Sequence, residues 1–131
     1  MTKSSELTTT ASKICSSGLI SLPPNSPIRE IIKVMAFWKY SQLPVQDISG
    51  CLGLVTENSI LKFQLDHGRD SMLKAKASDV MESPPPMVDW DQPITRDIIE
   101  LLYDAKCILV NLDGKLERII TLMDVLKEQK N

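Results

Sequence analysis

Two segments of this 131-residue chain recur in its second half, about 66 residues later and in the same order. "ASKIC" (11–15) recurs as "ASDVM" (77–81), and "SPIREIIKVM" (26–35) recurs as "QPITRDIIEL" (92–101). A unit of roughly 55 residues buries too little of its surface to be comfortably stable alone. The repeat therefore predicts two similar half-domains that stabilise one another.

Each copy carries the pattern of the same helix. Pro27 and Pro93 lie near the first turn of these helices, where a missing amide costs nothing. We expect Asn25 or Ser26 to cap the first helix and Asp91 to cap the second. The spacing i, i+3, i+4, i+7 of a helix with one buried face occurs at Ile28, Ile31, Ile32 and Met35, and a matching stripe occurs at Ile94, Ile98, Leu101 and Leu102.

Two short apolar runs follow each of these helices. The runs are separated by Ser49-Gly50 in the first copy and by Asp113-Gly114 in the second, which favours hairpins because glycine accepts a positive φ. A strand–helix–strand–strand–helix order, twice, predicts an α/β (α+β) fold of two β-α-β-β-α repeats. The remaining elements are short strands at 19–22 and 86–89, hairpin strands at 43–48, 51–56, 108–112 and 116–121, and closing helices at about 57–67 and 122–129.

The repeat also sets the expected domain limits. We expect a flexible, Ser/Thr-rich tail over residues 1–10, a first repeat over 11–67, a linker over 68–76 and a second repeat over 77–131. The start of the chain lacks the apolar core of a secretory signal. No apolar run approaches the ~20 residues of a membrane span. We therefore expect a cytoplasmic protein with no membrane association.

Composition argues against several classes of function. The formal net charge of −2 leaves no basic surplus for binding nucleic acid, which we do not expect as a partner. Cys15, Cys51 and Cys107 are widely spaced, which favours buried thiols over disulfides or a zinc site. His67 is the only histidine, and the sequence has no Gly-rich phosphate loop and no cluster of metal ligands. We expect neither an enzyme nor a metal site.

The repeated segments resemble paired cystathionine β-synthase (CBS) domains, the tandem often called a Bateman module. The resemblance covers about 11–129 and rests on "ASDVM" (77–81), "SQLPVQD" (41–47) and "IITLMD" (119–124) in their order. It implies two repeats packed about a pseudo-twofold axis and two clefts that bind adenosine compounds. The implied ligand is AMP, ADP, ATP or S-adenosylmethionine, without a further cofactor. A regulatory, non-catalytic homodimer is also implied.

The same resemblance implies the residues of one main ligand site. Asp124 matches the family's ribose-binding aspartate, and a carboxylate can accept hydrogen bonds from both ribose hydroxyls. Thr121 matches the residue that reaches ribose or phosphate, and Lys106 is placed to meet phosphate. The opposite wall is expected from the first copy, with Ile20 against adenine. The full implied set is Gly18, Ile20, Tyr40, Ser41, Lys106, Thr121 and Asp124.

The second cleft departs from the family's pattern. Thr56 is kept, but Ser59 stands in the position equivalent to Asp124. The segment "SPPP" (83–86) removes backbone amides where an adenine edge would be read, because proline has no N–H. Glu117-Arg118 stands where the family often has a small residue and glycine, so Arg118 either crowds a cleft or adds a phosphate contact. These departures argue against occupancy of the second cleft.

Structural alternatives accompany these assignments. Thr121 and Asp124 have the spacing of a capping box, and the two roles are compatible. For Tyr40 the alternative is a cover for the sheet edge, and for Lys106 it is a solvated cation. For the whole chain, the alternative is a module without a ligand that dimerises or docks on a partner protein.

Overall fold

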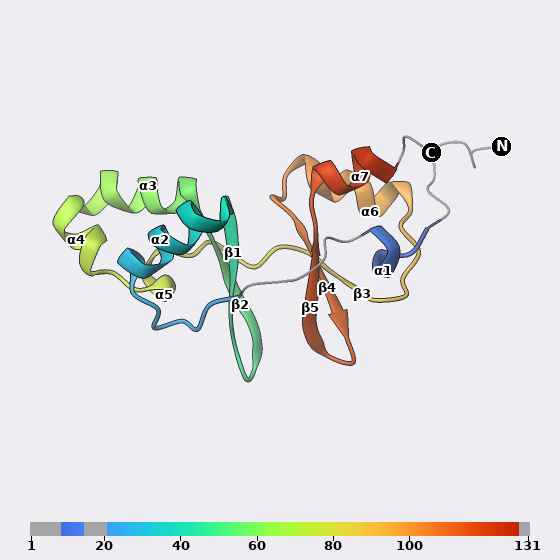
Figure 1. Cartoon of the computed structure of the whole chain (residues 1–131), viewed down its shortest axis with the longest axis horizontal. Coiled ribbons are helices and arrows are strands. Elements are labelled where there is room, and N and C mark those ends of the chain that lie inside the picture. Colours follow the sequence, from blue (N-terminus) through green and yellow to red (C-terminus); the bar gives the residue numbers. More distant parts are fainter. Residues whose placement is uncertain (1–8, 15–20, 129–131) are drawn as a thin grey trace. The chain divides into compact units, whose positions relative to one another are not determined.

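The computed structural model describes residues 9–14 and 21–128. The described residues form two compact units (Figure 1). The α2–α3 unit is the described part of Ile20–Pro84, and the α6–α7 unit combines the described residues of Met1–Leu19 with those of Pro85–Asn131. Both units mix helices with a small sheet, so the predicted α+β class is confirmed.

The α2–α3 unit is built on a two-stranded antiparallel hairpin. The pairing shifts register between Val45 and Gln46, and Leu22 adds a single parallel bridge to Val45. The predicted hairpin is therefore present. In chain order the elements are α2 (Ile28–Trp38), β1 (Gln42–Asp47), β2 (Gly50–Thr56), α3 (Glu57–His67), α4 (Arg69–Lys74) and α5 (Ala77–Val80).

The buried face of α2 largely follows its sequence pattern. Ile28, Ile31 and Met35 are at most 6% exposed and pack in one cluster with residues of β1 and β2. Ile32, which shares the same spacing, is 37% exposed. The apolar stripe of α2 is thus wider than the face that the unit covers.

The α6–α7 unit contains a three-stranded sheet in the order β3–β4–β5. β3 runs parallel to β4, and β5 is antiparallel to β4. The β4–β5 turn has positive φ at Asp113 (53°) and Gly114 (79°), as the predicted two-residue hairpin turn requires. The elements are α1 (Ala11–Ile14), β3 (Met87–Asp89), α6 (Arg96–Glu100), the 3₁₀ turn η2 (Leu101–Tyr103), β4 (Ile108–Leu112), β5 (Lys115–Ile120) and α7 (Leu122–Glu128).

The short helix that opens each copy packs in the unit formed by the other copy. Ala11 of α1 is fully buried in the core of the α6–α7 unit, and its amide donates to the Gln92 carbonyl at 3.0 Å. Ala77 of α5 is fully buried in the core of the α2–α3 unit, and its amide donates to the Ser26 carbonyl at 2.9 Å. The compact units therefore exchange these two helices relative to the sequence repeats.

The predicted helix caps are wrong. The N-cap residue of α2 is Pro27, which cannot cap through a side chain, so neither Asn25 nor Ser26 has that role. The second helix, α6, starts only at Arg96, after Thr95, so Asp91 lies too early in the chain to cap it. Pro27 and Pro93 lie nearer to the observed helix starts than the polar residues that were expected as caps.

Segments expected to be irregular contain structure. α4 lies within the stretch expected as a linker, and its Met72 is buried in the core of the α2–α3 unit. Residues 1–8 of the expected tail lie outside the described residues, but Thr9 accepts a hydrogen bond from the Ile94 amide at 3.0 Å. Of the strand expected at 19–22, residues 19 and 20 lie outside the described residues as well.

Candidate functional site

The open end of the β4–β5 hairpin brings together three of the residues expected to bind a ligand. Ile108 pairs with Ile120, so the residues just before β4 and just after β5 lie at the same end of the sheet. Thr121 connects β5 to α7, and Asp124 lies in the first turn of that helix. Lys106 lies two residues before β4 and is exposed.

Thr121 and Asp124 form the capping arrangement that their spacing predicts. Asp124 Oδ2 accepts hydrogen bonds from the Thr121 amide at 2.8 Å and from its hydroxyl at 3.0 Å. The Asp124 amide donates to Thr121 Oγ1 at 3.4 Å. The buried neighbours Ile120 and Val125 anchor the turn in the core. These contacts fix the orientation of a carboxylate that is only half-buried.

In the corresponding turn of the first copy, the side chains form hydrogen bonds within the turn itself. The Thr56 amide donates to Ser59 Oγ at 2.9 Å, and the Ser59 amide donates to Thr56 Oγ1 at 2.9 Å. The Ser59 hydroxyl donates in turn to the Thr56 carbonyl at 2.9 Å. Thr56 is 2% exposed and Ser59 is 5% exposed. This turn has no carboxylate at the position equivalent to Asp124, and the Thr56 and Ser59 hydroxyls bond to its own backbone.

Tyr40 and Ser41 lie at the matching end of the β1–β2 hairpin, in the α2–α3 unit. The Tyr40 amide donates to the Met35 carbonyl at 3.0 Å, and the Ser41 carbonyl accepts from the Glu57 amide at 3.3 Å. Tyr40 is 37% exposed. In the repeat, Ser41 corresponds to Lys106, so the two copies present a hydroxyl and a cation at equivalent positions.

The expected site residues are thus divided between the two units. Tyr40 and Ser41 belong to the α2–α3 unit, whereas Lys106, Thr121 and Asp124 belong to the α6–α7 unit. Gly18 and Ile20 lie outside the described residues. The structure therefore brings together the three residues of the α6–α7 unit.

Arg118 contacts other residues of the α6–α7 unit. Its guanidinium carbon lies 5.7 Å from the centre of the Trp90 ring, a cation–π distance. Its Nη1 donates to the Glu117 carbonyl at 3.1 Å and lies 3.5 Å from a Glu117 carboxylate oxygen. These partners account for the unusual Glu117-Arg118 pair without a ligand.

Other chemistry in the described part of the chain is limited. Residues 9–14 and 21–128 contain no group of three His, Cys, Asp or Glu side chains that could hold a metal ion. Cys107 is buried, and burial raises the pKa of the half-buried Cys51 thiol, which donates to the Gly53 carbonyl at 3.4 Å. Cys15 is not among the described residues. No helix of the described chain has the length and apolarity to cross a membrane.

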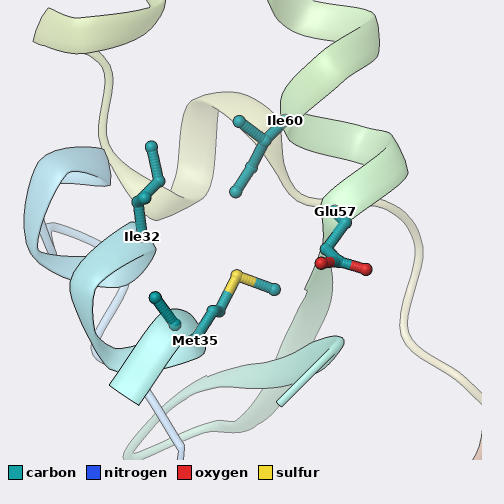
Figure 2. Close-up of a pocket in the computed structure, with 5 residues that line it drawn as sticks. Ile32, Met35, Glu57 and Ile60 are labelled. Carbon is teal, nitrogen blue, oxygen red and sulfur yellow. The ribbon is translucent and has the colours of Figure 1, made fainter. Parts of the chain in front are cut away.

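One feature was missed by the sequence analysis, a pocket of about 250 Å³ between α2 and α3. Figure 2 shows Met35 and Ile60 pointing toward one another across it, with Glu57 at its edge on the first turn of α3. Ile32 and Ala36 complete the lining. The available signal was Ala36, a small residue where the second copy has Leu102.

Comparison with known proteins gives the family and the fold. The family model of the CBS domain matches residues 11–66 and again residues 77–131. No curated protein matches the chain. Among solved structures, a CBS-domain containing protein from Agrobacterium tumefaciens is 22% identical with a TM-score of 0.78, covering 94% of this chain and 95% of that one.

Two further solved structures are similar over nearly the whole chain. A CBS domain-containing protein of unknown function from Bacillus anthracis is 19% identical with a TM-score of 0.82, covering 99% of this chain and 98% of that one. CBSX2, whose structure was solved in complex with AMP, is 20% identical with a TM-score of 0.75. That match covers 93% of this chain and 96% of CBSX2.

Proposed function

The chain belongs to the CBS domain family as a tandem pair, and on this premise we propose that it is a regulatory module that binds one adenosine-containing ligand and catalyses no reaction. The observation that carries the proposal is the Thr121–Asp124 arrangement, in which a half-buried carboxylate is held in place at the end of a hairpin. The AMP complex of CBSX2 supports the choice of ligand class.

The chemistry of these residues suits a nucleoside phosphate. A carboxylate accepts hydrogen bonds only, so Asp124 is matched to the two donor hydroxyls of ribose. Lys106 lies beyond the same end of the hairpin and supplies a positive charge for phosphate. The remaining residues that we propose for this site, on the family resemblance, are Gly18, Ile20, Tyr40 and Ser41.

We propose one ligand per chain. The equivalent turn of the first copy has Ser59 in place of the carboxylate, and its Thr56 and Ser59 side chains are nearly inaccessible. Opening this turn would leave buried hydrogen-bonding groups unpaired, which costs free energy. The aspartate that matches the family's ribose-binding residue is therefore present in only one of the two copies.

Calorimetric titration tests this function. We expect at least one of AMP, ADP, ATP and S-adenosylmethionine to bind with a Kd below about 1 mM, equivalent to a binding free energy of about 4 kcal/mol. GMP serves as the control for base selectivity. If all four adenosine compounds fail to bind, the ligand proposal is wrong.

The second candidate is a module that dimerises or docks on a partner protein without a ligand. The observation that favours it is that Thr121 and Asp124 satisfy one another as a helix cap, as Thr56 and Ser59 do in the other copy. A stable dimer or a co-purifying partner, together with a thermal transition unmoved by adenosine compounds, would favour this candidate. A homodimer is compatible with both candidates, and we include it in the proposal.

A further inference from the structure

The charges of the chain are divided unequally along its length. Residues 85–131, which supply Lys106, Thr121 and Asp124, contain six Lys and Arg and nine Asp and Glu, a formal net charge of −3. Residues 1–84 contain nine Lys and Arg and eight Asp and Glu, a formal net charge of +1. The proposed ribose and phosphate contacts therefore lie in the acidic part of the chain, which is unfavourable for a highly charged anion.

Most cations of this part of the chain are paired or lie away from the open end of the β4–β5 hairpin. Arg118 and Arg96 each pair with a glutamate of their own element, at 3.5 Å and 3.1 Å. Lys115 starts β5 at the turn, which is the other end of the hairpin. Lys127 lies in the last turn of α7, about 8 Å further along the helix axis than its first residue. Among the described residues 85–128, Lys106 is therefore left as the cation at the open end.

An exposed carboxylate lies close to Lys106 in the chain. Asp104 follows the 3₁₀ turn η2, and its amide donates to the Leu101 carbonyl. Asp104 is two residues before Lys106, so the Cα atoms of the two residues are at most about 7 Å apart. This separation is shorter than the Debye length of about 8 Å at physiological ionic strength, so salt does not fully screen Asp104 from an anion that Lys106 binds. With Asp124, the open end has two carboxylates and one cation.

We propose that Asp104 limits the negative charge of the ligand, so that the site prefers an adenosine compound with at most one phosphate group over ADP and ATP. Lys106 offers one positive charge to one phosphate group. Each further phosphate group adds negative charge near Asp104 without a second cation at the open end to offset it. This inference rests on the proposed function and specifies the class of ligand within it.

Calorimetric titration of the unaltered chain without divalent cations tests this selectivity. In low salt, we expect the affinity to fall from AMP to ADP and from ADP to ATP, because the added charges repel Asp104. At about 1 M salt, where the Debye length is about 3 Å, the ratio of the ATP and AMP dissociation constants should shrink several-fold. An affinity for ATP that equals or exceeds the affinity for AMP in low salt would overturn this inference and leave the proposed function intact.

The variant Asp104→Asn removes the charge and keeps the size of the side chain. It should strengthen the binding of ATP several-fold, strengthen the binding of AMP by less, and affect the uncharged adenosine least. It should not strengthen the binding of S-adenosylmethionine, because the sulfonium of that ligand is positive. A substitution that acted only through folding would change the apparent affinity for all these ligands in the same direction.

Asp113→Asn is the matched control. Asp113 lies at the turn of the same hairpin, and asparagine tolerates its positive φ of 53°. This variant changes the net charge by the same amount and should leave the ratio of the ATP and AMP dissociation constants near that of the unaltered chain. An equal change of the ratio in both variants, or no change in Asp104→Asn, would overturn the role of Asp104. If every adenosine compound failed to bind, the proposed function would be overturned, and this inference with it.

Discussion

Asp124 accepts two hydrogen bonds from Thr121, from the amide at 2.8 Å and from the hydroxyl at 3.0 Å, and both end on the same carboxylate oxygen. The contact therefore holds the start of α7 and also fixes the direction of a half-buried carboxylate. In the first copy, Thr56 and Ser59 form a reciprocal cap without a carboxylate at the equivalent position. Both turns cap a helix, but only the turn of the second copy has a carboxylate at this position. Variants of the two turns can therefore distinguish the capping role of Asp124 from its proposed binding role.

The first prediction uses this difference. Asp124→Ala should abolish measurable binding of the adenosine ligand and lower the free energy of unfolding by about 1 kcal/mol, the usual cost of a lost cap. Calorimetric titration and denaturant unfolding measure the two effects on the same protein.

Ser59→Ala is the matched control for that change. It removes the Ser59 side-chain contact from the corresponding capping box of α3, so it should cost about as much stability, on the order of 1 kcal/mol, while the ligand affinity stays unchanged. Equal loss of affinity in both variants would mean that Asp124 acts only through stability. Retained affinity in Asp124→Ala would remove this residue from the site.

The second prediction concerns the proposed phosphate contact. Lys106→Ala should weaken binding of AMP about two- to fivefold, the range of an exposed ion pair, and leave binding of adenosine unchanged. Lys115→Ala, at the turn end of the same hairpin, is the control and should affect neither ligand. An equal loss for adenosine and AMP would contradict a phosphate role.

The third prediction tests the exchange of the short opening helices. Ala11 and Ala77 are equivalent in the repeat and fully buried, each in the core of a different unit. Ala11→Gln should therefore speed amide hydrogen exchange in β3–β5 and α6, and Ala77→Gln should do so in α2–α4. Each substitution overpacks its site at a cost of about 1–3 kcal/mol.

The pattern of exchange decides between two arrangements. If Ala11→Gln instead loosened α2 and α3, the first opening helix would belong to its own copy. Lys13→Glu, at an exposed position of α1, controls for changes in charge and should leave exchange near that of the unaltered protein.

The fourth prediction concerns Gly53 in β2. A Cβ at this position would lie 2.5 Å from the Glu82 carbonyl oxygen and 2.7 Å from Met81 Sδ. Leu54 exchanges two backbone hydrogen bonds with Glu82, so the neighbouring chain cannot simply move away. Gly53→Ala should lower the free energy of unfolding by about 1–3 kcal/mol, measured in denaturant. Cys51→Ala on the same strand should lower the free energy of unfolding by less. Equal losses in the two variants would contradict the claim that Gly53 is required by the close approach of Glu82 and Met81.

The sequence predicted the parts of the fold that follow from local pattern. The hairpin turn at Asp113-Gly114 needed residues that accept positive φ, and the buried stripe of α2 needed only helical spacing. The Thr121–Asp124 pair was predicted as a capping box from its spacing, which the hydrogen bonds confirm. These features depend on residues that are close together in the chain.

The parts that were missed depend on tertiary contacts. α4 is held by burial of Met72 against other helices. The sequence pattern of such a short segment does not predict this burial. The exchange of α1 and α5 depends on the contacts of Ala11 and Ala77 with distant residues. The pocket at Glu57 arises because Ala36 leaves space between two helices, which required their packing to be known.

The most direct test of the account is a crystal of this protein grown with the tightest-binding adenosine compound. We expect ligand density beside residue 124, with the ribose hydroxyls at about 2.5–3.0 Å from the Asp124 carboxylate oxygens, the range of hydrogen bonds to a carboxylate. Ligand density at another place, with no ligand atom within hydrogen-bond distance of the Asp124 carboxylate, would contradict it.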